Sequence, residues 1–110
     1  RKGENLARDF LKQKGYKIIE QNYRTRYAEI DIVAQEKDVL VIVEVRTKMG
    51  EQFGSPEETI DWRKQKRLRR NAVSYAAFKK WDKLYRIDAI CIVLNPDFSI
   101  SRLDHYENIE

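Results

Sequence analysis

The segment from Val39 to Val43 restricts the fold of this chain more than any other feature. Its five residues are all apolar, so both faces of the strand that it predicts must be covered. Such a strand lies in the centre of a sheet with helices on its two faces. At 110 residues the chain has room for one core, and we expect residues 1–110 to form a single domain around this strand.

The remaining apolar patterns predict the order helix, three strands, helix, two strands. Leu6 with Phe10 and Ala7 with Leu11 form an i,i+4 stripe, which indicates a helix over 3–14 that ends at Gly15. Strands are expected over 16–23, 28–35, 39–48, 86–94 and 99–106. Because a helix connects strands 39–48 and 86–94, these two should run parallel. The predicted fold class is α/β (α+β), with a mixed central sheet flanked by helices.

The start of the second helix is predicted from three agreeing signals. Ser55 can cap the helix, Pro56 suits its first position, and Glu58 completes a capping box. We expect the helix to run to about Trp81. Its inward stripe is formed by Ile60, Leu68, Ala72, Tyr75 and Ala76.

The strand over 28–35 alternates in polarity. One face is expected to carry Ile30, Ile32 and Ala34, and the other Glu29, Asp31 and Val33. The hairpin that follows is expected to turn at Lys37-Asp38.

That hairpin places Glu44 directly opposite Asp31 and Arg46 opposite Glu29 on one face. Like charges in such positions repel, so the acidic pair requires either a divalent cation or a shared proton that raises one pKa. Two carboxylates and one fixed cation suit metal-assisted phosphodiester hydrolysis, with Mg²⁺ or Mn²⁺ held by Asp31 and Glu44. Glu4 lies at the edge of the first helix's apolar stripe and is a third candidate metal ligand. Alternatively, it only complements the helix dipole.

Positive charge is concentrated in one part of the second helix. The net charge is +4, yet six of the eight residues over 63–70 are Lys or Arg. Such a run is either a track for nucleic acid or an ordinary solvated face. Lys64 lies within the apolar stripe, so it either points toward the sheet and a phosphate or lays its stem along apolar surface. The candidate nucleic-acid-binding residues are Lys64, Arg63, Lys66, Arg67 and Arg70.

Other site chemistries are limited by composition. The single Cys91 excludes an internal disulfide and a cysteine zinc site, and its apolar neighbours indicate a buried thiol. His105 is the only histidine, which excludes a histidine pair as metal ligands. The longest apolar runs are far too short to span a membrane. We therefore expect a cytoplasmic protein with no membrane partner.

Short segments across residues 3 to about 94 together resemble the YraN family of small bacterial proteins. The matching segments are Gly3-Glu4-Asn5-Leu6-Ala7, Gly15-Tyr16, Asn22-Tyr23-Arg24, Glu29-Ile30-Asp31-Ile32-Val33-Ala34, Val41-Ile42-Val43-Glu44-Val45-Arg46, Gly54-Ser55-Pro56, Lys64 with Arg67-Leu68, and Arg86-Ile87-Asp88. Each segment is short, and only their combination in this order is specific.

That family looks like the restriction-endonuclease-like superfamily, so the resemblance implies its core fold and its Asp … Glu-x-Lys metal site. Asp31 and Glu44 match the two acids, and Arg46 stands at the lysine position. Arginine stays protonated and cannot act as a general base, so its implied role is to orient water or contact phosphate. Lys48, two residues further along the same face, is the alternative cation. Glu4 matches the helical acid of the resolvase-like members.

The resemblance thus implies a metal-dependent nuclease that acts on nucleic acid, DNA rather than RNA, and that forms a homodimer as resolvase-like proteins do. Arg46 in place of lysine favours a second hypothesis, a nucleic-acid-binding module that keeps the fold without catalysis. A third hypothesis is a protein-interaction scaffold without affinity for nucleic acid. Only the first two predict binding that weakens steeply with salt.

Overall fold

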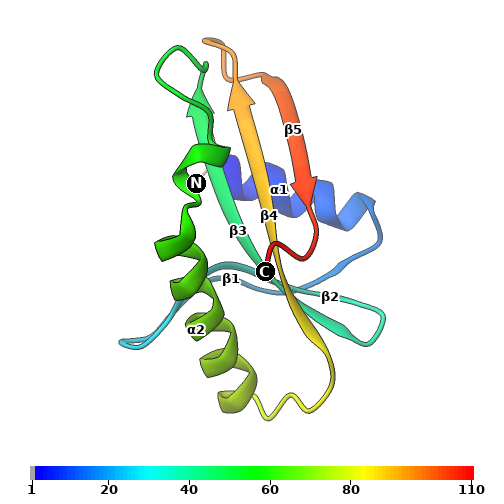
Figure 1. Cartoon of the computed structure of the whole chain (residues 1–110). Helices are drawn as coiled ribbons and strands as arrows, with labels where there is room; N and C mark the ends of the chain where they lie inside the picture. The colour runs from blue at the N-terminus through cyan, green and yellow to red at the C-terminus, as the bar shows by residue number, and fades with distance from the viewer. Residues whose placement is uncertain (1) are drawn as a thin grey trace.

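A five-stranded sheet with a helix on each face forms the protein (Figure 1). This computed structural model describes residues 2–110. The elements are α1 (Lys2–Gln13), β1 (Lys17–Arg24), β2 (Glu29–Glu36), β3 (Val39–Met49), the 3₁₀ turn η1 (Glu57–Thr59), α2 (Trp62–Phe78), β4 (Tyr85–Leu94) and β5 (Ile100–Tyr106). The predicted fold class and element order are confirmed. Within residues 2–110, none of the helices combines the length and apolar character needed to cross a membrane.

The central strand is β3, as its unbroken apolar run predicts. The sheet order is β1-β2-β3-β4-β5, and β3 pairs antiparallel with β2 and parallel with β4. Val41 and Val43 pack into the core under α1, whereas Leu40 and Ile42 pack into the core under α2. Glu44, two residues beyond Ile42, therefore falls on the α2 side of the sheet.

The register of the β2–β3 hairpin is the predicted one. The chain turns at Lys37, whose φ of +54° lies in the left-handed region. Val33 pairs with Ile42, and Gln35 pairs with Leu40. A slip of one residue would have moved every side chain of β3 to the other face. The turn and the apolar pattern thus fix which helix the acidic end of the hairpin faces.

β2 separates from β3 just before the predicted acidic pair. The last paired residues are Ile32 and Val43. Beyond them, the Oδ2 atom of Asp31 accepts a hydrogen bond of 2.9 Å from the backbone N–H of Val45. The Asp31 side chain here takes the place of a backbone hydrogen bond between β2 and β3, so the regular alternation of side chains between the two faces of β2 ends. The expected common face of Ile30 and Ile32 is therefore wrong: Ile30 packs under α2, and Ile32 packs under α1.

The predicted start of the second helix is also wrong. Ser55 does accept a hydrogen bond of 3.3 Å from the N–H of Glu58, but this contact closes only the short turn η1. Asp61 is the true N-cap of α2, and its Oδ1 accepts a 2.9 Å hydrogen bond from the N–H of Lys64. Two residues that can cap a helix, Ser55 and Asp61, thus lie six positions apart in the sequence. The first closes the turn η1, and the second starts α2.

The inward face of α2 agrees with the predicted stripe. Its buried residues are Leu68, Ala72, Tyr75 and Ala76. Ile60 precedes the helix but still packs against the same core. The helix ends at Phe78, not near Trp81.

Replacing Asp61 with alanine should lower the melting temperature by about 5 °C, because α2 loses the side chain that satisfies an unpaired N–H in its first turn. Ser55→Ala removes only the acceptor in η1 and should have a smaller effect. Thermal unfolding of the two variants measures the difference. A larger loss from Ser55→Ala would contradict the assignment of the cap.

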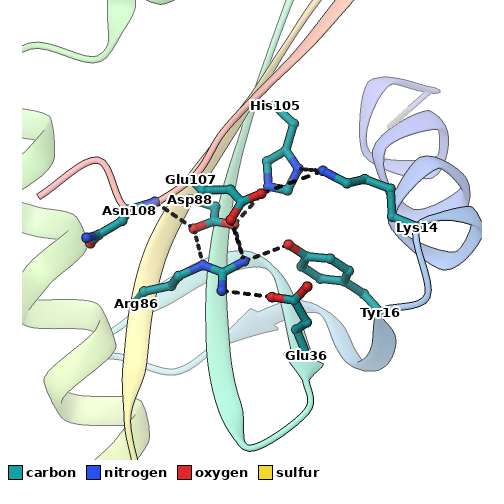
Figure 2. A network of polar contacts seen from close by, with 8 residues as sticks. All are labelled: Lys14, Tyr16, Glu36, Arg86, Asp88, His105, Glu107 and Asn108. Carbon is teal, nitrogen blue, oxygen red and sulfur yellow. Dashed lines mark hydrogen bonds and ion pairs between the residues drawn. The ribbon is translucent and has the colours of Figure 1, made fainter.

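On the α1 side of the sheet, a network of charged side chains joins four parts of the chain (Figure 2). Asp88 is fully buried and accepts hydrogen bonds from Arg86 at 2.9 Å and from the N–H of Asn108 at 3.0 Å. His105 Nε2 lies 2.8 Å from Asp88 Oδ2, and Nδ1 lies 2.8 Å from the Lys14 ammonium. Since an ammonium only donates, the histidine must donate to Asp88 through Nε2. Asp88 is therefore an ion-paired acid in the interior of the fold.

Candidate metal and nucleic-acid site

The separation of β2 from β3 places Asp31 and Glu44 at one cavity on the α2 side. This cavity has a volume of about 720 Å³ and is lined by both carboxylates. Glu44 is only 5% exposed. Its burial, and next the negative charge of Asp31, raise the pKa of Glu44 to about 7, although the nearby cations Lys64 and Arg46 act in the opposite direction. The acidic pair is therefore incompletely neutralised by its surroundings.

Two cations from different elements contact the same oxygen of Glu44. The Lys64 ammonium and the Arg46 guanidinium each lie 3.1 Å from Oε2. Lys64 reaches it because it precedes Leu68 by one turn on the buried face of α2, and Leu68 packs over the sheet. Of the two interpretations of Lys64, the one that directs it toward the sheet is confirmed.

The side chains that line the cavity carry both signs of charge. Its acidic side chains are Glu4, Glu29, Asp31 and Glu44, and its basic side chains are Arg24, Arg26, Arg46, Lys64 and Arg67. Five basic side chains beside four carboxylates in one cavity suit a phosphate group and a metal ion together.

Arg24 and Arg26 also line the cavity, and neither is among the site residues predicted from the sequence. Arg24 is the last residue of β1, and Arg26 lies in the short connection to β2, which also brings Tyr27 to the cavity wall. Tyr27 is 77% exposed, and Arg26 lies over its ring at 5.6 Å. Asn71 of α2 donates a 2.9 Å hydrogen bond to the Glu29 carbonyl and fastens the helix to this edge of β2. Three positively charged or aromatic residues within four positions, 24–27, are the signal that could have indicated this wall.

Whether the cavity can hold a metal ion depends on how many carboxylates lie close enough to bind the same ion. Within residues 2–110, no three Asp, Glu, His or Cys side chains lie close enough to hold one ion. Glu4 lines the cavity, but it does not complete a three-acid cluster with Asp31 and Glu44. Two carboxylates still fit Mg²⁺, which retains several waters and is often bound by one or two carboxylates together with substrate phosphates. The residues present therefore suit a site that depends on a phosphate for part of its ligands.

Glu4 reaches the cavity because the first turn of α1 lies tightly against β3. A Cβ atom added to Gly3 would lie 1.9 Å from Thr47 Oγ1 and 3.0 Å from Thr47 Cβ. Glycine at this position thus permits the close approach of the helix.

Replacing Gly3 with alanine should reduce the free energy of unfolding by about 1–3 kcal/mol, because the added methyl group overfills this contact. It should also move Glu4 away from the cavity. Chemical denaturation measures the loss, and Thr47→Ala in the same chain should recover part of it by removing the Oγ1 atom. Full stability of Gly3→Ala alone would contradict the close packing.

The other predicted site residues lie outside this cavity. Lys48 is not among its lining residues, because β3 continues past the cavity alongside β4, where Lys48 pairs with Val93. Lys66 and Arg70 line a separate depression on α2 together with Val73. Arg63 lies over the exposed ring of Trp62 at 5.2 Å. The basic run of α2 is thus divided, with Lys64 and Arg67 at the cavity and the others on different faces.

The isolated cysteine and histidine are both structural. Cys91 is fully buried, and burial raises the pKa of its thiol to about 12. This confirms the expected burial of the thiol. His105 belongs to the network on the α1 side of the sheet, across from the cavity.

Comparison with known proteins gives one consistent family. Residues 3–92 match the uncharacterised protein family UPF0102. A UPF0102 protein of Thermodesulfovibrio yellowstonii is 38% identical over 108 residues, which cover 98% of this chain and 91% of that protein. A second, from Pelotomaculum thermopropionicum, is 39% identical with the same coverage, and one from Syntrophomonas wolfei is 48% identical over 66% of this chain and 64% of its own length. The resemblance to the YraN family is thereby confirmed, and the chain belongs to UPF0102.

Proposed function

We propose that this protein is a metal-dependent nuclease that hydrolyses phosphodiester bonds, with DNA as its substrate rather than RNA. One observation carries the proposal. The buried carboxylate of Glu44 lies beside Asp31 in a wide cavity, with Lys64 and Arg46 in contact with it. Acids that would repel each other, surrounded by basic side chains, are the arrangement expected for a site that takes up a metal ion and a phosphate.

In this proposal each side chain has one task. Asp31 and Glu44 would hold Mg²⁺ or Mn²⁺, which supplies Lewis-acid activation of the phosphate and a more acidic bound water. Asp31 is kept in place by the Val45 N–H. Because arginine is a poor general base, Arg46 would stabilise negative charge on the phosphate and would not accept the proton of the attacking water.

The basic walls would bind the phosphate backbone. Lys64 and Arg67 lie on the α2 side of the cavity, and Arg24 and Arg26 lie on the wall formed by the end of β1 and its connection to β2. A strand entering the cavity would therefore meet positive charge on both sides. Glu4, in the first turn of α1, lines one edge of the cavity and would orient water molecules near the site.

Cleavage of labelled single-stranded, duplex and branched DNA, and of RNA, tests the proposal. The protein should cleave DNA with Mn²⁺ or Mg²⁺ and not with EDTA, and Asp31→Asn should slow cleavage by at least about 100-fold. Asp38→Asn is the matched control, because it makes the same chemical change at an exposed turn outside the cavity. Cleavage that persists in Asp31→Asn would contradict the proposal.

The same two ion pairs favour a second candidate function, a nucleic-acid-binding module without catalysis. If Lys64 and Arg46 neutralise Glu44 permanently, the cavity binds phosphate but takes up no metal. This candidate predicts DNA binding that weakens steeply with salt, with no cleavage under any metal condition.

A further inference from the structure

In the free protein, two basic side chains form ion pairs with Glu44, the carboxylate that would bind the proposed metal. Glu44 Oε2 lies 3.1 Å from Lys64 Nζ and 3.1 Å from an Arg46 guanidinium nitrogen. A divalent ion bound to Glu44 would meet the repulsion of both charges at close range. Entry of the metal alone is therefore opposed by the protein.

The two cations differ in how easily they can leave. Arg46 is on the same strand as Glu44, two residues away, and its Nε atom is buried. Lys64 comes from α2 on a flexible four-carbon stem, and its side chain is 21% exposed at the cavity wall. Among residues 2–110, Glu44 is the carboxylate with which Lys64 forms an ion pair. Lys64 is thus the cation that can exchange its partner.

A phosphate in the cavity offers Lys64 such a partner. Once the ammonium turns from Glu44 to the phosphate, Oε2 is released for the metal, and the phosphate supplies ligands that the two-acid site lacks. We infer that Lys64 makes the binding of metal and nucleic acid interdependent, so that each ligand strengthens the binding of the other. This inference rests on the proposed function and adds a means of regulation: the site would bind its metal more tightly when substrate is present.

Thermodynamic linkage makes the inference quantitative. If DNA increases the affinity for Mn²⁺ by some factor, Mn²⁺ must increase the affinity for DNA by the same factor. Isothermal titration of the whole chain with Mn²⁺, with and without a phosphorothioate DNA duplex that resists cleavage, gives the first factor. Fluorescence anisotropy of the same duplex, with and without Mn²⁺, gives the second. We expect both factors to be at least about fivefold in the unmodified protein.

Three variants separate coupling from ordinary charge effects. Lys64→Met should raise the Mn²⁺ affinity of the free protein by at least about fivefold and bring the coupling factor close to one. Lys66→Met removes an equal charge from another face of α2 and should keep the coupling. Lys64→Arg keeps the charge beside Glu44 and should resemble the unmodified protein, which also shows whether position 64 tolerates substitution.

Two outcomes would overturn the inference. One is an equal Mn²⁺ affinity with and without DNA, and the other is unchanged or weaker Mn²⁺ binding by Lys64→Met. Either result, in a protein that binds Mn²⁺ and cleaves DNA, would leave the proposed function standing and remove only the coupling. A protein that neither binds Mn²⁺ under any condition nor cleaves DNA would contradict both.

Discussion

Replacing Glu44 with glutamine should raise the free energy of unfolding at pH 8 by about 3 kcal/mol, because the change removes a buried charge that opposes folding. The same variant should lose metal-dependent cleavage, because it removes a proposed metal ligand. A gain in stability together with a loss of activity is expected of a residue placed for function rather than for folding.

The pH dependence of this gain follows from the raised pKa of Glu44. In the unfolded chain the carboxyl ionises near its ordinary value of 4.5, whereas burial raises the pKa in the folded protein to about 7. Between these values the folded state holds the proton more tightly, so stability falls as the pH rises. The advantage of Glu44→Gln should be complete at pH 8, shrink as the pH falls through 7, and vanish near pH 4.5.

Denaturant unfolding at pH 5 and pH 8 measures both effects. Glu29→Gln is the matched control, since Glu29 also lines the cavity but is well exposed, and its ion-pair partner within residues 2–110 is the exposed Arg24. Its stability should change little at either pH. Destabilisation of Glu44→Gln at pH 8 would mean that the ion pairs to Lys64 and Arg46 stabilise the fold, and would contradict this account.

On the opposite face of the sheet, Asp88→Ala should destabilise the protein by about 3–5 kcal/mol, because it leaves Arg86 without its closest acid in a buried network. Burial by itself would raise the pKa of Asp88, but hydrogen bonds from His105, Arg86 and the Asn108 N–H outweigh it and lower the pKa. The carboxylate therefore stabilises the fold above its ordinary ionisation range. That contribution is lost as the pH falls through the lowered pKa.

Denaturation of Asp88→Ala from pH 7 to pH 3 tests this prediction. The difference in free energy of unfolding between Asp88→Ala and the unmodified protein should stay constant down to about pH 5 and disappear below pH 4. Asp38→Ala, which removes a largely exposed acid paired with Lys83 at 3.7 Å, should leave stability almost unchanged. A gap that widens in acid would contradict the role of Asp88 shown in Figure 2.

The strands and their register were predictable because they depend on local patterns. The apolar run Val39–Val43 is compatible only with a central strand, and the turn at Lys37 fixes how it pairs with β2. The face of Glu44 followed from these two facts. Lys64 lies one helical turn before the buried Leu68, a position for which the sequence left two orientations open, and the structure places its ammonium beside Glu44.

Errors arose where two local signals competed or where a side chain replaced the backbone. Ser55 and Asp61 are both good helix caps, and sequence alone does not show that the first closes only a single turn. The face of Ile30 changed because Asp31 bonds to the backbone of β3 and interrupts the alternation. Arg24 was missed as a site residue because its position depends on how the β1–β2 connection folds toward the cavity.

The central claim is that Asp31 and Glu44 together hold a divalent metal against a phosphodiester. An anomalous-scattering map from a crystal grown with Mn²⁺ and a phosphorothioate DNA duplex tests it most directly. We predict one strong peak about 2.1 Å from oxygens of both carboxylates, next to a DNA phosphate, with Lys64 moved from Glu44 to that phosphate. DNA bound in the cavity without a metal peak between the two acids, and with Lys64 still on Glu44, would contradict the claim.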